Sequence, residues 1–228
     1  MKQNIYEQQQ KRKSELKALQ SQINPHFLYN TLDSIIWMAE GKKNEEVVVM
    51  TASLARLLRQ SISNEEEQVP IGQEVEYARS YLTIQKMRYK DKLEFQIQVD
   101  AQIMGVPIIK LVLQPLIENA IYHGLKYKEG KGLLIVRGYR EGENAVIQIK
   151  DNGAGMDEQT LSHIFEKHKV NYRSNGVGVY NVQKRLQLYY GMDYGITYSS
   201  RQGEGTTASI VIPMNMIPMK QEADHEKI

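Results

Sequence analysis

The chain has 228 residues and a formal net charge of +2, and 41% of its residues are hydrophobic and 25% charged. This balance is typical of an ordinary globular protein, and the small net charge gives no indication of a nucleic-acid partner or a membrane surface. The absence of cysteine excludes disulfides, thiolate nucleophiles and cysteine-ligated metals, and no apolar run approaches the roughly 20 residues needed to cross a bilayer.

Residues 4–40 predict one long helix that contains a proline. Pro25 lies in its interior, where a proline costs roughly 3 kcal/mol because it removes a backbone donor and clashes with the preceding turn. His26 follows directly, with Asn30 one turn further on. An expensive kink beside a titratable side chain suggests a chemical role for this segment. The helical pattern rests on apolar residues that recur every three or four positions: Leu16, Leu19, Ile23 and Phe27.

A second helix is predicted over about residues 45–61, after a stop at Gly41 and two lysines. Two antiparallel helices joined by a short turn make a helical hairpin, and two hairpins make a four-helix bundle. Because one hairpin has only a thin core, dimerisation is the natural way to bury both apolar stripes. The acidic segment 63–70 is the best linker, so we expect a dimerising helical hairpin over residues 1–64.

The remainder predicts an α/β sandwich over residues 65–214, followed by a frayed tail over 215–228. Alternating apolar residues predict strands, and three- or four-residue spacing predicts helices. The expected fold class is therefore α+β, with helices on one face of a mainly antiparallel sheet. The expected elements are a helix at 72–89, a strand at 93–99, a helix at 108–124 that includes Pro115, strands at 133–140 and 145–150, a loop at 152–175, a helix at 177–190, and strands at 195–199 and 206–213.

Asp151 ends an apolar strand and opens the sequence Asp-Asn-Gly-Ala-Gly that closes at Gly155. A carboxylate fixed there can accept a hydrogen bond from an exocyclic amine such as that of adenine, and the glycines let a backbone approach a ligand closely. Taken alone, an exposed turn capped by aspartate explains the motif equally well.

Two further motifs lie on predicted helices. Gly176 and Gly178 open one helix, where free amides and the helix dipole attract anions. Asn119 and His123 are four residues apart and share a face of another. An asparagine oxygen suits Mg²⁺, which binds few protein groups in addition to phosphates, and the adjacent Glu118 could orient a water or accept a proton. Considered alone, each motif can be explained without a ligand, the glycines as a helix-entry turn and the polar residues as ordinary side chains at the protein surface.

Together the motifs resemble the ATP-binding domain of the GHKL superfamily, which includes gyrase and the histidine kinases. Glu118 and Asn119 match its N box, residues 151–155 its G1 box, Gly176 and Gly178 its G2 box, and residues 203–206 its Gly-x-Gly-Thr turn. Residues 22–30, Gln-Ile-Asn-Pro-His-Phe-Leu-Tyr-Asn, narrow the resemblance to LytS/YesM-type sensor histidine kinases. This phosphoacceptor segment is their hallmark, and the likeness covers roughly residues 16–213.

The resemblance implies a role for each motif in ATP-dependent protein-histidine kinase chemistry. His26 would take the γ-phosphate of ATP, Asn119 would bind the Mg²⁺ that bridges the phosphates, and His123 would face a phosphate. Asp151 would accept a hydrogen bond from adenine N6, with Thr206 nearby. The lid backbone would pack on the nucleotide at four glycines: Gly153, Gly155, Gly176 and Gly178.

One departure from better-known histidine kinases concerns the proton of His26. Many of those kinases place an acid directly after the phosphorylated histidine as a base, whereas Phe27 follows here. We hypothesise that Glu118, or a group hydrogen-bonded through Asn30, fills this role. Pro25 would either let one half of the helix swing against the other or form a static kink.

The resemblance also implies partners and a location. We expect a homodimer that passes phosphate to the receiver domain of a response regulator, without nucleic acid. We expect sensor and transmembrane parts to precede residue 1, which would place this region on the cytoplasmic side of a bacterial membrane. Two alternatives stay open: a GHKL ATPase that drives a conformational clamp, with Glu118 activating water, and a non-catalytic dimerisation module that senses nucleotide.

Overall fold

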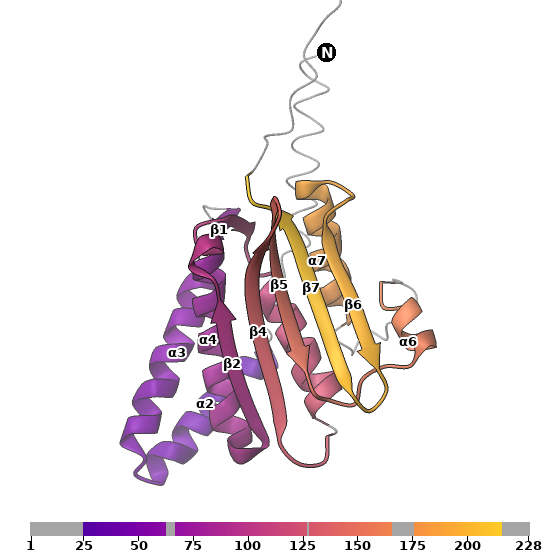
Figure 1. Cartoon of the computed structure of the whole chain (residues 1–228). Helices are drawn as coiled ribbons and strands as arrows, with labels where there is room; N and C mark the ends of the chain where they lie inside the picture. Colours follow the sequence, from indigo (N-terminus) through magenta and orange to yellow (C-terminus); the bar gives the residue numbers. More distant parts are fainter. Residues whose placement is uncertain (1–24, 63–66, 127, 166–175, 216–228) are drawn as a thin grey trace, which may run out of the picture.

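The computed structural model describes residues 25–62, 67–126, 128–165 and 176–215 (Figure 1). Its first two helices, α2 (Pro25–Glu40) and α3 (Asn44–Ile62), form the predicted hairpin. The amides of Gly41 and Lys43 bond to carbonyls in the last turns of α2, so the chain reverses at the predicted stop. Pro25 is the first described residue of α2. The predicted helix before it, and therefore the predicted kink, lies outside the described residues.

A five-stranded sheet forms the centre of the following region. Its strands are β2 (Leu93–Val99), β4 (Gly132–Glu141), β5 (Asn144–Asp151), β6 (Gly195–Arg201) and β7 (Gly205–Pro213). They lie in the order β2-β4-β5-β7-β6, and only the β2–β4 pair is parallel. The prediction of a mainly antiparallel sheet is confirmed.

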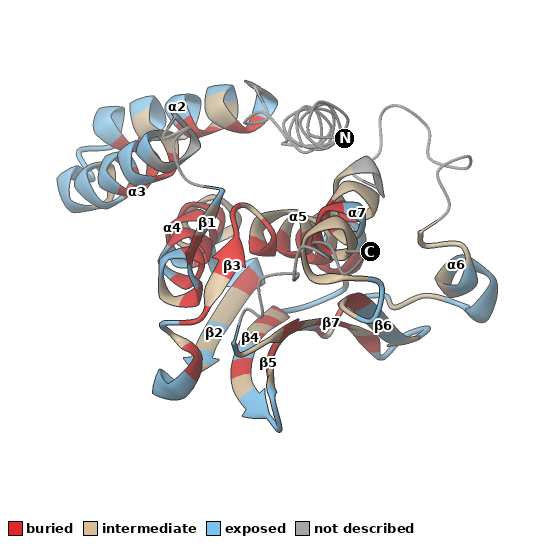
Figure 2. Ribbon diagram, turned by 90° about the horizontal axis from the view of Figure 1, so that it is seen from above, coloured by how far each residue is buried: buried red, intermediate tan, exposed pale blue. Residues whose placement is uncertain are grey.

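Helices cover one face of this sheet (Figure 2). They are α4 (Ile71–Tyr89), α5 (Leu113–Asn119) and α7 (Gly176–Tyr190), while the short α6 (Glu158–Ser162) lies beyond β6. Two 3-10 turns, η1 (Lys90–Lys92) and η2 (Ala101–Ile103), flank β2. Burying a large apolar side chain is worth about 1.5–3 kcal/mol. The core between helices and sheet includes the fully buried Leu82, Leu113, Val136, Ile147, Leu186 and Ile210.

The predicted helix at 108–124 is wrong at both ends. Its first residues belong to β3 (Pro107–Ile109), which pairs antiparallel with β1 (Gln68–Pro70). Its last residues form a π-helix, η3 (Ala120–Leu125). Only the middle is α-helical, and there Pro115 is tolerated because it stands in the first turn, where its missing N–H has no intrahelical partner.

A buried carboxylate explains why α5 begins at Leu113. Glu74 of α4 is 1% exposed and accepts backbone N–H groups of Leu111, Val112 and Leu113 at 2.8, 3.1 and 3.3 Å. These amides would otherwise be orphan donors at a helix start. The spacing of apolar residues does not reveal this tertiary contact. The helix predicted from that spacing therefore began too early, at residue 108 instead of Leu113.

The hairpin packs on the sheet-containing region through α4. Phe27 of α2 is 3% exposed and stacks on Tyr81, with ring centroids 5.0 Å apart. The Tyr77 hydroxyl donates to the carbonyl of Leu57 at 3.3 Å. The predicted domain boundary at residue 64 stays a prediction. No helix within the described ranges combines the length and the apolar character needed to span a bilayer.

Candidate functional site

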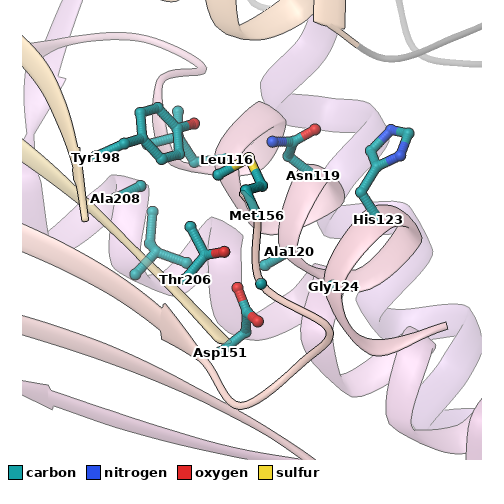
Figure 3. Close-up of a pocket in the computed structure, with 12 residues that line it drawn as sticks. Leu116, Asn119, Ala120, His123, Gly124, Asp151, Met156, Tyr198, Thr206 and Ala208 are labelled. Atoms are coloured by element: carbon teal, nitrogen blue, oxygen red, sulfur yellow. The ribbon is translucent and has the colours of Figure 1, made fainter. Parts of the chain in front are cut away.

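A pocket lies between the α5–η3 helix and the ends of the strands β5, β6 and β7 (Figure 3). Its empty volume is about 390 Å³, including the solvent at its mouth. Apolar side chains form its floor and polar groups face it from both sides. The lining residues are Leu116, Asn119, Ala120, His123, Gly124, Ile149, Asp151, Gly155, Met156, Tyr198, Thr206 and Ala208.

Asp151 is the acidic group of the pocket. It ends β5, is 3% exposed, and accepts the backbone N–H of Gly153 at 2.8 Å. Thr206 lies opposite it in the register of β7, so the two side chains enter the pocket from neighbouring strands. Burial raises the pKa of Asp151, and the amides of Gly153 and Thr206 and the charge of Lys128 offset part of that shift.

The glycines after Asp151 bring three distant segments together. A Cβ on Gly153 would overlap the backbone of Gly124, and Gly155, at φ +66°, would overlap the carbonyl of Arg201. The backbone between them is held from both sides, because Ala154 donates to the Gly124 carbonyl at 3.0 Å and accepts from Gly203 at 2.6 Å. Only glycine fits these close approaches. The motif therefore fixes the carboxylate of Asp151 and is no ordinary exposed turn.

Asn119 and His123 face the pocket from the helix side, as their spacing predicted (Figure 3). Asn119 ends α5, and His123 lies in the π-helix η3. Partial burial lowers the pKa of His123, with a smaller contribution from the charge of Lys126. The imidazole is therefore neutral at pH 7, a hydrogen-bonding group without a fixed charge. Single π-turns occur frequently at functional sites.

Sequence reasoning missed Tyr198, which enters the pocket from β6 (Figure 3). Its hydroxyl is buried and has no hydrogen-bond partner of acceptable geometry among the described residues. Burial raises the pKa of the phenol, and the nearby side chain of Asn119 partly offsets the shift. The alternation of β6 places Tyr198 on the face of Ile196 and Ser200, the only signal that could have found it. Met156 was missed because it follows the glycines in a loop without periodicity.

His26 and Asn30 lie outside the pocket lining, on α2. His26 is exposed, and the amide nitrogen of Asn30 lies 3.0 Å from its Nδ1 and 3.3 Å from its Nε2. Asn30 therefore holds the ring from one turn away. The adjacent Phe27 is buried against Tyr81, so the backbone beside His26 is anchored to α4.

Glu118 also lies outside the pocket lining. Its carboxylate accepts the side-chain amide of Gln114 at 2.9 Å. Burial raises its pKa, and Gln114 and the Tyr81 hydroxyl partly offset that shift. The Tyr81 hydroxyl in turn accepts from Gln85 at 2.7 Å. Glu118 thus belongs to a buried polar network that reaches the stacking partner of Phe27.

The predicted lid glycines are placed unequally. Gly155 lines the pocket, whereas Gly153 packs behind it on Gly124. Gly176 is the first residue of α7, and a Cβ on Gly178 would lie 3.4 Å from Pro115 of α5. Gly178 does not line the pocket, and residues 166–175, which precede the helix, lie outside the described part of the chain.

The donor set suits Mg²⁺ only in company with phosphates. Within the described ranges, no three His, Asp or Glu side chains gather as a metal cluster. Asn119 offers one amide oxygen at the pocket, and Mg²⁺ binds through one or two protein groups when substrate phosphates and waters complete its shell. The residues therefore fit a metal that binds together with a nucleotide. The apolar floor and the single carboxylate fit the adenine ring of that nucleotide.

Two family models match consecutive parts of the chain. The histidine kinase model matches residues 14–93, and the histidine kinase-, DNA gyrase B- and HSP90-like ATPase model matches residues 106–216. Among solved structures, the catalytic domain of the histidine kinase ThkA superposes with a TM-score of 0.51, covering 64% of this chain and 96% of that domain. At 14% identity this likeness supports the fold alone.

Several curated relatives match nearly the whole chain. Sensor histidine kinase YesM of Bacillus subtilis is 37% identical over 93% of the chain, and YpdA of Escherichia coli is 33% identical over 92%. Sensor protein LytS of Oceanobacillus iheyensis is 31% identical over 89%. The chain spans about a third of the length of these relatives, between 35% and 36%. This chain belongs to the sensor histidine kinases, of which it carries the histidine kinase region and the GHKL-type ATPase domain.

Proposed function

We propose that this chain transfers the γ-phosphoryl group of ATP to His26, and from there to an aspartate in the receiver domain of a response regulator. The observation that carries the proposal is the pocket in which Asp151, Thr206, Asn119 and His123 converge. The same chain presents an exposed histidine in a segment matched by the histidine kinase model.

The pocket suits adenine at its buried end. Asp151 would accept a hydrogen bond from the adenine amino group, because its carboxylate is fixed by the amides of Gly153 and Thr206 and has the capacity to accept more than these two bonds. Thr206 stands beside it on β7 and adds a hydroxyl that is already within 2.9 Å of Ser200. The floor of Leu116, Ile149 and Ala208 would contact the face of the base.

The phosphates would lie toward the helix side of the pocket. Asn119 would give an oxygen to Mg²⁺, which when bound neutralises charge on the phosphates. His123, neutral at pH 7, would donate a hydrogen bond to a phosphate oxygen. These residues position the nucleotide and do not react with it, which is the main task of a protein in phosphoryl transfer.

At His26 an unprotonated ring nitrogen would attack the γ-phosphorus. A phosphorus–nitrogen bond forms, the bond to the bridging β,γ-oxygen breaks, ADP leaves, and the proton on the other ring nitrogen passes to a base. Asn30 would orient the ring, as its amide does in this structure. Glu118 remains our candidate base because a raised pKa suits proton acceptance near neutral pH, and a group reached through Asn30 is the alternative.

The hairpin would form the dimer interface with a second copy of the chain. Its exposed large apolar side chains are Tyr29, Leu32, Ile36, Trp37, Val48 and Val49. A four-helix bundle of two hairpins would bury such a surface. By the names of its relatives, the chain would act in a sensor protein, and we propose that this region faces the bacterial cytoplasm.

Incubation with γ-labelled ATP and Mg²⁺ tests the proposal against its alternatives. We expect acid-labile, base-stable label on the protein that is absent from His26→Ala and strongly reduced in Asp151→Asn. Free phosphate without protein label would support a GHKL ATPase, a reading favoured by the position of Glu118 beside Asn119. Nucleotide binding with neither product would support a sensing module. The variant His163→Ala controls for loss of an unrelated histidine.

A near-wild-type rate of labelling in Glu118→Gln would remove Glu118 from the mechanism. The matched control is Gln114→Ala, which removes the hydrogen-bond partner of the carboxylate and leaves the carboxylate itself. If Glu118 is the base, Glu118→Gln loses labelling at all pH values, while Gln114→Ala keeps it.

A further inference from the structure

A second pocket lies on the other side of the π-helix η3, where α4 ends and β2 and β4 begin. Its empty volume is about 540 Å³, including the solvent at its mouth. Leu93, Ile121 and Leu125 form its floor and are all at least nine-tenths buried. Tyr89, half-buried at the end of α4, adds an aromatic wall. The floor is thus apolar and built by β2 and η3, and α4 adds the aromatic wall.

The rim of this pocket is cationic. Lys92, Lys126 and Lys128 line it, and no acidic side chain does so in the part of the chain that the structure describes. The nearest acid in sequence to Leu93, Glu94, is engaged by Lys86 and Lys131 at 2.7 and 3.3 Å. Charge complementarity therefore calls for an anion at the rim, and the floor calls for a flat apolar body beneath it.

We propose that this second pocket binds a small anionic amphiphile, an aromatic or short-chain carboxylate, with its apolar body on Leu93, Ile121 and Leu125 and its carboxylate among Lys92, Lys126 and Lys128. Ligand pockets are commonly concave and mostly apolar, with a few charged groups that fix orientation. The site is separate from the nucleotide pocket and does not rest on the proposed phosphotransfer.

The two pockets share the π-helix as a common wall. Ala120, His123 and Gly124 of η3 line the nucleotide pocket, while Ile121 and Leu125 of the same six residues line the second one. Gly124 packs closely on Asp151 of β5, because a Cβ at this position would lie only 2.7 Å from the carboxylate. The helix η3 therefore cannot move toward β5 without displacing Asp151. A ligand that shifts η3 therefore acts directly on the nucleotide side.

The lysines of the second pocket also act electrostatically on residues of the nucleotide pocket. Lys126 contributes to lowering the pKa of His123, and Lys128 contributes to lowering that of Asp151. A carboxylate bound between these lysines would offset their positive field at the nucleotide pocket. We therefore expect an occupied second pocket to weaken binding of the anionic nucleotide modestly.

Calorimetric titration with 2-naphthoate tests the site. We expect one binding site per chain, with affinity reduced at least about fivefold in the double variant Lys126→Gln/Lys128→Gln, as expected for two partly exposed charge pairs. Lys131→Gln is the matched control, since this lysine lies beside the pocket and pairs with Glu94. The uncharged 2-naphthamide should bind wild type more weakly and should not distinguish the variants.

A second titration separates the two pockets. ADP affinity, measured at rising 2-naphthoate, should fall by about twofold to fivefold and then level off, because coupling between distinct sites saturates. An ADP affinity that keeps falling without limit would place the probe in the nucleotide pocket and overturn the proposal. Equal affinity of 2-naphthoate for the wild type and the double variant would also overturn the proposal. Displacement of 2-naphthoate by inorganic phosphate at equal concentration would do so too, since the apolar floor would then contribute nothing to binding.

Discussion

Burial of Asp151 makes its ionised form costly for stability, although that form is the better hydrogen-bond acceptor. The residue is 3% exposed, and burial raises the pKa of its carboxyl. A raised pKa in the folded state means that the protonated form is favoured there. The stabilising contribution is complete below the unfolded pKa and is lost as pH rises through the folded pKa. Ionisation of Asp151 in the folded protein therefore costs stability, and the ionised form is the one that we propose accepts a hydrogen bond from a ligand.

The first prediction concerns Asp151→Asn. We expect ADP affinity to fall by about tenfold to a hundredfold, because a charged hydrogen-bond acceptor is lost. The free energy of unfolding at pH 7 should stay equal or rise, since the neutral amide can still accept from Gly153 and no charge is buried. Calorimetry and urea denaturation measure the two quantities, and a large loss of stability would contradict this account of the site.

The second prediction concerns the unpartnered hydroxyl of Tyr198. Tyr198→Phe should raise the free energy of unfolding of the nucleotide-free protein by about 1 kcal/mol, because a buried polar group without a partner is removed. Tyr77→Phe is the matched control. Its hydroxyl donates to Leu57, so its loss should destabilise. Urea denaturation decides, and destabilisation of both variants alike would show that Tyr198 has a partner.

At this scale the sequence predicted which residues meet better than it predicted their surroundings. Asn119, His123, Asp151, Gly155 and Thr206 converge in one pocket, because spacing and strand ends determine where their side chains emerge. Tyr198 could not be singled out. Its buried hydroxyl depends on how β6 packs beside the α5–η3 helix, and this tertiary arrangement leaves no pattern in the chain.

The start of α5 depends on a residue of another helix. Three backbone amides at its start bond to Glu74, which belongs to α4. Arg185 of α7 is 4% exposed, donates to the carbonyl of Lys110 at 2.6 Å, and helps to balance the charge of Glu74. One buried carboxylate thus joins three helices behind the pocket and determines where the helix that carries Asn119 begins.

The third prediction follows from this junction. Glu74→Ala should lower the free energy of unfolding by about 3 kcal/mol or more, because buried amides and the buried cation Arg185 lose their partner. Glu76→Ala, on the exposed face of the same helix, should change it by less than about 0.5 kcal/mol. Equal effects in urea denaturation would show that the capping contact has little energetic weight.

The elements themselves were predictable to different degrees. The strands from β4 to β7 were predicted within two residues, because alternation and turn residues are local signals. The short β3 and the π-helix η3 were not. β3 exists because it pairs with β1, and η3 is a wider turn whose apolar residues serve two pockets. Both depend on contacts far apart in sequence, which a 3.6-residue period cannot represent.

In the molecule as a whole, α4 connects α2, the proposed phosphoacceptor helix, to the proposed nucleotide pocket. Phe27, the neighbour of His26, stacks on Tyr81, and Tyr81 lies beside Glu118, the neighbour of Asn119. His26 itself does not line the pocket. Phosphoryl transfer in this account therefore needs α2 to move relative to the pocket or a second copy of the chain to supply the nucleotide.

The fourth prediction concerns that second copy. Ile36 and Trp37 are 57% and 54% exposed on α2, and Ile36→Glu/Trp37→Glu should convert a dimer into a monomer because it places charges in an apolar interface. Met192→Glu, which alters an exposed apolar residue between α7 and β6, should leave the dimer intact. Light scattering after size exclusion gives the mass, and a wild-type monomer at every concentration would contradict the proposed bundle.

The measurement that tests the central claim most directly is the location of phosphate on the protein. After incubation with ATP and Mg²⁺, mass spectrometry under neutral or alkaline conditions assigns the modified residue. We expect phosphate on His26 that is strongly reduced in Asp151→Asn and absent from protein given ADP. Phosphate on another residue, or ATP consumed with His26 unmodified, would contradict it.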